Sequence, residues 1–219
     1  MGASAVNVRF RYTKTGRAKY ISHLDMLRTF QRAFARAGID VLHSEGFNPH
    51  PKFNLVLPLP TCCESLCEYL DAGVASELGT DELCRALDAA LPEGIRIESA
   101  APPVMKAGSV RFASWSCLIR LDSASPQETA QYVSGVLSAP ELQIVKKTKR
   151  GESVIDLPAH MSDLHILTEE RGVRIEVTLP CFEPSLTPRS LLAAMPELPP
   201  YTEYCVRTAV FNEKMEPFC

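Results

Sequence analysis

The order of expected strands and helices repeats once along this chain. In the first half, the apolar pattern predicts strand, helix, strand, strand, helix, strand at residues 6–12, 22–37, 53–59, 66–74, 80–91 and 95–99. Ala101-Pro102-Pro103 and Gly108 then mark the best boundary. The second half predicts a strand at 115–121, a helix from Ser125-Pro126, a strand at 142–145, a hairpin over 164–168 and 173–179, a short helix from Thr187-Pro188 and a strand at 204–211. This repetition limits the chain to an α+β architecture built from two similar halves.

The repeated order is that of a ferredoxin-like unit, βαββαβ. We therefore predict an α+β fold of two tandem ferredoxin-like units, over residues 1–104 and 105–219. The prediction depends on the repeated order of elements and on a basic block followed by an acidic block in each half, because residue-level similarity between the halves is slight. Residues 146–160 are the least defined part of the second half, and the alternative to a binding role for the basic cluster at 146–151 is a solvated hairpin end.

Composition excludes several classes of protein. With 46% apolar and 22% charged residues, 219 residues can bury a substantial core. No basic segment followed by an apolar run opens the chain, and no window approaches eighteen consecutive apolar residues. We therefore expect a soluble, cytoplasmic protein without a membrane span. In that compartment the eight scattered cysteines should be reduced thiols, mostly in the core.

The best-defined element is the first helix. Ser22 is a candidate N-cap, and Asp25 stands where a capping box places a carboxylate, although Glu or Gln is usual there. Gly38 should end the helix. One apolar stripe should face a core, made by Leu24, Leu27, Phe30, Phe34 and Ala37.

Charge alternates along the chain although the formal net charge is only −3. Residues 1–52 hold nine Lys and Arg against three Asp and Glu, and residues 53–105 hold two against nine. The next two blocks, 106–151 and 152–219, hold seven against three and five against eleven. Either the blocks neutralise one another on ordinary solvated faces, or a basic face binds a polyanion and an acidic face binds something else.

The basic residues favour RNA as that polyanion. Arg28, Arg32 and Arg36 recur every fourth residue along one helix face, as in a phosphate-binding surface. Aromatic rings at Tyr12, Tyr20, Phe47 and Phe53 could stack on bases, whereas the alternative places these rings in the core. The candidate RNA- or substrate-binding residues are Lys14, Arg17, Lys19, Arg28, Arg32, Arg36, Phe47, Asn48, His50, Lys52, Lys146, Lys147 and Lys149.

The loop after the first helix, residues 44–52, is rich in turn residues and holds His50 between two prolines. The candidate acid–base residues are His23, Asp25 and His50, although His23 could equally fix the helix start by a structural hydrogen bond. No metal site is expected, because Cys62-Cys63 and Cys67 lack paired Cys-x-x-Cys spacing. Nucleotide-binding and hydrolase motifs are absent from the sequence.

Four motifs carry a family resemblance. They are Phe10-Arg11-Tyr12-x-Lys14-x-Gly16, Tyr20-Ile21-Ser22-His23-Leu24-Asp25, Arg32-Ala33-x-x-Arg36-Ala37-Gly38 and Ser44-Glu45-Gly46-Phe47-Asn48-Pro49-His50-Pro51-Lys52. With them the chain resembles the radical-SAM-associated family, mostly uncharacterised bacterial proteins encoded beside or fused to a radical SAM protein. More distantly it resembles the ferredoxin-like CRISPR repeat-processing endonucleases, which bind RNA; that likeness is one of fold.

The resemblance implies a radical SAM protein as partner. Because this chain lacks the Cys-x-x-x-Cys-x-x-Cys run of radical SAM enzymes, the iron–sulfur cluster and S-adenosylmethionine are expected on that partner, with no cofactor in this chain. We expect a non-catalytic subunit that recognises RNA or another substrate for RNA modification or ribosome-related processing, with no DNA or membrane partner. The alternatives are a metal-independent ribonuclease and a protein-interaction adaptor without RNA binding.

Overall fold

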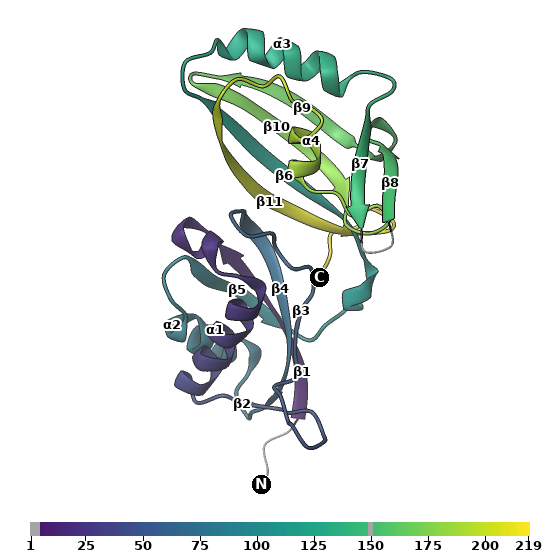
Figure 1. The fold of residues 1–219 in the computed structure, drawn as a ribbon. Coiled ribbons are helices and arrows are strands. Elements are labelled where there is room, and N and C mark those ends of the chain that lie inside the picture. Colours follow the sequence, from purple (N-terminus) through teal and green to yellow (C-terminus); the bar gives the residue numbers. More distant parts are fainter. Residues whose placement is uncertain (1–4, 149–150) are drawn as a thin grey trace. The chain divides into compact units, whose positions relative to one another are not determined.

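The computed structural model describes residues 5–148 and 151–219, and of residues 147 and 148 it describes the backbone alone. The chain divides into two compact units, Met1–Val110 with Phe218–Cys219, and Arg111–Pro217. The second unit is therefore inserted between two segments of the first. Each unit combines α-helices with a β-sheet, so the fold is α+β (Figure 1).

In its described part, the first unit has one antiparallel sheet and two long helices. Its elements are β1 (Ala5–Lys14), α1 (His23–Arg36), β2 (Asp40–Val41), β3 (Phe53–Leu55), β4 (Glu64–Ala75), α2 (Thr80–Ala90) and β5 (Ile95–Ala101), with short 3₁₀ turns at Gly16–Tyr20 and Ala107–Ser109. Strand β1 lies between β5 and β4, and β2 and β3 pair with the other edge of β4. All these neighbours are antiparallel.

Both helices of the first unit pack on one face of this sheet. Phe10 and Tyr12 of β1 meet Phe34 and Phe30 of α1 edge to face, with ring centroids 5.6 and 5.0 Å apart. Leu83 and Leu87 of α2 are buried in the same core. The alternation along β1 sends Arg9 and Arg11 to the opposite face of the sheet.

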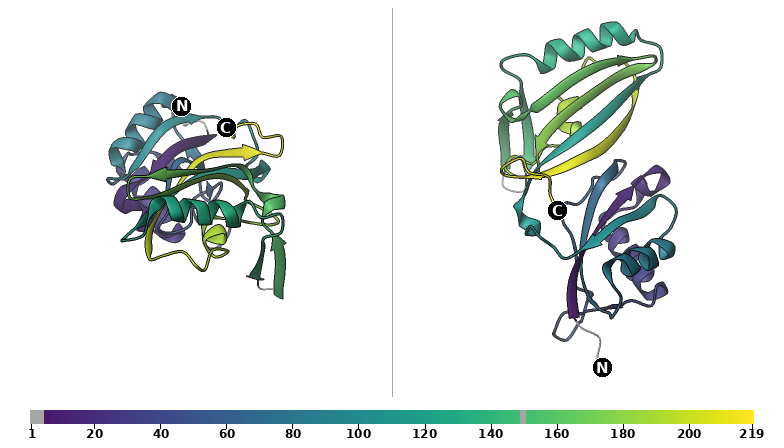
Figure 2. Two further views of the ribbon diagram at one scale, coloured as in Figure 1. Left: turned by 90° about the horizontal axis from the view of Figure 1, so that it is seen from above. Right: turned by 180° about the vertical axis from the view of Figure 1, so that it is seen from behind.

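Over its described residues, the second unit contains two α-helices, a four-stranded sheet and a separate hairpin. Its elements are β6 (Val110–Leu121), α3 (Pro126–Leu137), β7 (Gln143–Thr148), β8 (Gly151–Asp156), a 3₁₀ turn (Pro158–His160), β9 (Ser162–Glu169), β10 (Gly172–Pro180), α4 (Pro188–Leu192) and β11 (Tyr201–Asn212). The strands follow the order β11-β6-β10-β9, while β7 and β8 form a separate two-stranded sheet. Figure 2 shows α3 lying along this sheet, with the β7–β8 hairpin apart from it.

The helix caps agree with the sequence analysis at three positions. Ser22 caps α1 and Ser125 caps α3 through their side chains. At the end of α1, Gly38 adopts φ +67°, Ile39 N donates to Phe34 O at 3.0 Å and Gly38 N donates to Ala35 O at 3.3 Å. This pair of bonds is a Schellman motif, so the helix ends where the glycine predicts.

Three local predictions need correction. Leu24 is 63% exposed and Met26 takes its place in the core, because the buried face of α1 starts two residues later than the expected stripe. The sequence favours Thr80 as the cap of the helix at residues 80–91, but Gly79 is the N-cap of α2 and Thr80 is its first helical residue. The sulfurs of Cys117 and Cys205 form a disulfide, which differs from the expectation of eight reduced thiols; neighbouring strands β6 and β11 bring the two side chains together.

Over the part of the chain that the structure describes, no helix has the length and apolar character needed to cross a membrane.

Candidate nucleic-acid interface

The predicted arginine row lies on the solvent side of α1. Arg28, Arg32 and Arg36 are all exposed. Nη1 of Arg28 lies 2.9 Å from Oδ1 of Asp25, and the Arg36 guanidinium donates to the carbonyl of Ala90 at the end of α2, at 3.2 Å from Nε and 2.5 Å from Nη2. The row is therefore a basic surface on a rigid element, with its last member held against α2.

Asp25 serves the helix start. Ser22 Oγ accepts from the Asp25 backbone N–H at 3.3 Å and donates to the Asp25 carboxylate at 2.7 Å. The hydrogen bond from Ser22, followed by that from Arg28, lowers the pKa of the Asp25 carboxyl. A carboxylate held ionised is a poor general acid, so the geometry favours Asp25 as a capping residue over Asp25 as a catalytic one.

The loop after β2 is a closed hairpin over residues 42–52. Ser44 N donates to His50 O at 2.9 Å, and Lys52 N donates to Leu42 O at 2.8 Å. The His50 backbone N–H donates to Ser44 Oγ at 3.1 Å, and its ring Nδ1 lies 2.8 Å from the Asn48 carbonyl oxygen, which it can contact only as a donor. These bonds hold the loop in one conformation before any ligand binds.

The tip of this hairpin presents an aromatic ring to solvent. Phe47 is fully exposed, and Glu45, Asn48 and His50 around it are exposed too. Gly46 supports the tip with φ +124°, which a side chain would strain. The fully exposed ring on this hydrogen-bonded loop is therefore available for contact with a ligand.

The other predicted basic residues are placed differently. Lys14 is only 2% exposed and its Nζ donates to the Ile21 carbonyl at 2.8 Å, so it is not available to phosphate at the surface. Lys19 is largely covered and pairs with Glu64 at 3.9 Å. Arg17 and Lys52 are exposed.

In the second unit, Lys146 on β7 is half-buried and donates to the Ser185 carbonyl. The Lys147 side chain and Lys149 lie outside the described residues. The second basic cluster therefore contributes one described side chain, which is bound to the protein itself.

Two of the four expected stacking rings belong to the core. Tyr12 is 2% exposed, and Phe53 is half-buried with its ring 5.1 Å from that of Phe34. The alternation of β1 buries Tyr12 on the helix side of the sheet. The alternative stated for this ring, a place in the core, is therefore the one observed. Tyr20 is 62% exposed and remains accessible together with Phe47.

The fold gathers four titratable side chains at one small cavity. Tyr12 and Lys14 of β1, His23 of α1 and Glu68 of β4 line a space of about 10 Å³, which is near the limit for one water molecule. Lys14 and Glu68 are both buried, whereas His23 is exposed at the rim. Sequence reasoning selected His23 and Lys14 separately. It missed Glu68, because only strand pairing places β4 beside β1.

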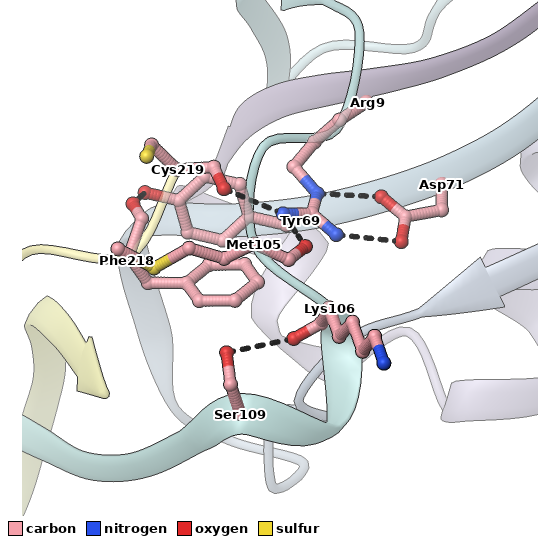
Figure 3. Close-up of polar contacts among 8 residues, drawn as sticks. All are labelled: Arg9, Tyr69, Asp71, Met105, Lys106, Ser109, Phe218 and Cys219. Atoms are coloured by element: carbon pink, nitrogen blue, oxygen red, sulfur yellow. Dashed lines mark hydrogen bonds and ion pairs between the residues drawn. The ribbon is translucent and has the colours of Figure 1, made fainter. Parts of the chain in front are cut away.

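A second polar cluster, centred on Arg9, was not predicted as a site. Arg9 is 4% exposed and binds the Asp71 carboxylate through Nε at 2.6 Å and Nη2 at 2.8 Å. Its Nη1 donates to the carbonyls of Met105 at 2.9 Å and Cys219 at 2.6 Å (Figure 3). The guanidinium also lies 4.4 Å from the centroid of the Phe218 ring.

Tyr69 completes this cluster by donating from its hydroxyl to the Phe218 carbonyl at 2.7 Å (Figure 3). Burial raises the pKa of the Tyr69 phenol, so the hydroxyl keeps its proton and its hydrogen bond. No local pattern distinguishes Arg9 from the exposed Arg11 two residues later, so the sequence held no signal for the cluster.

The comparisons with known proteins place the chain in a family. A family model described as "Uncharacterized protein conserved in bacteria (DUF2344)" matches residues 7–186. The chain belongs to this family. The matched range of this DUF2344 protein includes the arginine row, the hairpin and the small cavity, while α4 and β11 lie beyond it.

A search of curated proteins finds no match to this DUF2344 chain. Among solved structures, the crystal structure of an unknown protein from Galdieria sulphuraria is similar over 93% of this chain and 99% of that chain, with 11% sequence identity and a TM-score of 0.28. A score this low supports no conclusion about fold or function. Among the described residues, no group of three His, Cys, Asp or Glu side chains is suited to hold a metal ion.

Proposed function

We propose that this protein is an RNA-recognition subunit that works with a separate radical SAM enzyme, in RNA modification or ribosome-related processing. The observation that carries the proposal is the exposed row of Arg28, Arg32 and Arg36 on α1. Cations on a rigid helix can bind successive phosphates without reading sequence. The braced hairpin of the same unit adds Phe47, a ring on which a base can stack.

The proposed architecture is a pair of ferredoxin-like units. In the first unit the strand order β5-β1-β4-β3, with two helices on one face, supports this assignment. In the second unit the order β11-β6-β10-β9 supports it too, with the β7–β8 hairpin as an insertion. Sheets of this kind offer one helix-free face, a common platform for single-stranded RNA.

The radical SAM partner is proposed from the family resemblance and from the sequence. The chain has no Cys-x-x-x-Cys-x-x-Cys run, so an iron–sulfur cluster and S-adenosylmethionine would be held by the partner. Affinity purification with and without nuclease tests this part. Capture of the radical SAM protein only while RNA is intact supports a shared RNA, and capture without any RNA binding would favour the adaptor alternative.

Removal of the arginine row tests RNA binding. The Arg28→Ala/Arg32→Ala/Arg36→Ala variant should bind single-stranded RNA more weakly, and its log–log salt slope should fall by about 2, at roughly 0.7 per lost phosphate contact. A control variant loses the same charge elsewhere, through Arg85→Ala, Arg96→Ala and Lys214→Ala. Unchanged affinity and slope in the helix variant, or equal losses in both variants, would contradict the proposal.

A second candidate, a metal-independent ribonuclease, is favoured by the cavity shared by Tyr12, Lys14, His23 and Glu68. A rim imidazole can transfer protons to or from a ribose hydroxyl, and a buried ammonium beside it can stabilise developing negative charge. Incubation of the protein with structured RNA in EDTA tests this candidate. Cleavage that disappears in His23→Ala but persists in His50→Ala would support it, and no cleavage of any RNA would exclude it.

A further inference from the structure

A cleft of about 240 Å³ lies beside the Arg9 cluster, within the first unit. It is on the face of β1 opposite the two helices, and it is bordered by the segment after β5 and by residues 218–219. Its lining is largely apolar or aromatic, with Tyr69, Pro102, Val104 and Phe218. Val104 is 80% exposed, so most of this apolar side chain at the cleft faces solvent.

The floor of the cleft is held rigidly. The Phe218 ring contacts Tyr69 edge to face, with centroids 5.0 Å apart, and it lies under the Arg9 guanidinium. Arg9 is fixed in turn by the Asp71 carboxylate and two backbone carbonyls (Figure 3). A floor that is ordered before binding lowers the entropy cost of holding a ligand.

Arg11 supplies hydrogen-bond donors at the cleft, and its ion-pair partner Glu98 lies just outside the lining residues. Arg11 lines the cleft, and its Nε lies 3.2 Å from Oε2 of Glu98. The side chains of this ion pair are 46% and 41% exposed, so the pair contributes little to stability and can exchange partners with a ligand. Ser99 adds a hydroxyl to the lining.

We propose that this cleft binds one nucleobase of a single-stranded RNA. The inference rests on the RNA-binding function proposed above and adds a base-binding subsite separate from the arginine row. The volume is below the roughly 300–1,000 Å³ of sites for drug-sized ligands, and it suits a single ring system. A nucleobase combines a flat apolar body with donors and acceptors on its edge, which match the apolar walls, the Arg11 guanidinium and the Ser99 hydroxyl.

Other ligand classes use only part of this site. An inorganic anion would use Arg11 but not the apolar walls, and Glu98 would repel it. An acyl chain would use the walls but would leave the Arg11 guanidinium unmatched. The combination of both features is what favours a heterocyclic base.

Titration of the full chain with the four nucleoside 5′-monophosphates tests the inference, with ribose 5-phosphate as the baseless control. At least one nucleotide should bind at least tenfold more tightly than ribose 5-phosphate and shift the backbone NMR signals of Ser99 and Val104. Val104→Glu should weaken this binding at least tenfold. The matched control Val154→Glu, at a valine of 63% exposure on β8, should leave it unchanged. Arg11→Met provides a second variant in case Val104→Glu does not fold.

The outcomes separate this inference from the proposed function. If wild-type protein binds RNA but binds nucleotides no better than ribose 5-phosphate, the subsite is wrong and the RNA-binding proposal stands. If the α1 triple variant loses RNA while its nucleotide binding persists, both stand as separate surfaces. Loss of nucleotide binding in that triple variant would assign the base to the arginine row and overturn the subsite.

Discussion

Arg9 and Asp71 are directly opposite each other on β1 and β4, and their side chains form a two-point ion pair with N–O distances of 2.6 and 2.8 Å. Arg9 is 4% exposed and Asp71 is 22% exposed. The third guanidinium nitrogen, Nη1, donates to the backbone carbonyls of Met105 and Cys219. This pair therefore joins the strands of the first unit to the segments that enter and leave the inserted second unit.

Removal of Asp71 should be strongly destabilising. Asp71→Ala leaves a buried guanidinium without its counter-ion, for which we expect a loss of about 3 kcal/mol in unfolding free energy. Urea denaturation followed by circular dichroism measures the loss. Glu77→Ala, which removes an exposed carboxylate beyond the end of β4, is the control and should change stability by less than about 0.5 kcal/mol. Equal effects would mean that the ion pair is not a structural centre.

Two glycine substitutions should have opposite signs. Gly38 has φ +67°, so Gly38→Ala should destabilise by about 1 kcal/mol through backbone strain. Gly135 lies on the exposed side of α3, and an added Cβ there meets no atom within 4 Å. Gly135→Ala should therefore stabilise by about 0.5–1 kcal/mol. Thermal unfolding compares them, and the same sign in both would refute the assignment of the Schellman motif.

Asp25 should titrate below an ordinary aspartate. Because its folded-state pKa is lowered, the stabilisation it gives to α1 is present above the unfolded pKa of 3.8 and is lost as pH falls through the folded value. Carbon-13 NMR of the carboxyl group follows this titration. Ser22→Ala should raise the Asp25 pKa more than Arg28→Gln does, since the Ser22 hydrogen bond is the larger cause. The control variant Arg85→Gln on α2 should leave the Asp25 pKa unchanged. A larger rise in Arg28→Gln than in Ser22→Ala would show that the Arg28 charge affects this pKa more than the Ser22 hydrogen bond does.

The hairpin tip should matter for binding and not for folding. Phe47→Ala should leave the melting temperature within about 1 °C of wild type, because the fully exposed ring contributes nothing to the core. Its RNA affinity should fall roughly 5- to 150-fold, the range for loss of one stacked base. Leu78→Ala, at another exposed apolar residue, serves as the control. A large drop in melting temperature with unchanged RNA affinity would make the hairpin a structural clasp.

The double change His50→Ala with Asn48→Ala probes the same loop. The His50 ring bonds to the Asn48 backbone carbonyl, which survives substitution of the Asn48 side chain, so the bond is lost only through His50. We expect a melting temperature close to that of wild type and weaker RNA or partner binding. Calorimetry measures the melting temperature and a binding titration on the same preparation measures the affinity. Unchanged affinity would show that the hairpin tip does not contact RNA or the partner.

The helix caps and the positions of the main strands and helices can be predicted from the local sequence. Ser22, Ser125 and Gly38 act through hydrogen bonds to residues a few positions away, so their roles as caps follow from the local chain. Alternating side chains define β1, and the hydrophobic period defines α1 except at its first turn, where Met26 is buried in place of Leu24.

Tertiary structure decided which polar residues meet and which are covered. Lys14 and Arg17 look alike in the sequence, but pairing of β1 with β4 buries Lys14 beside Glu68 and leaves Arg17 in solvent. Arg9 forms its ion pair with Asp71, which is 62 residues away in the chain, and Cys117 forms its disulfide with Cys205, which is 88 residues away. Such contacts depend on strand register, which is fixed by burial of the whole sheet face and not by the residues beside each partner.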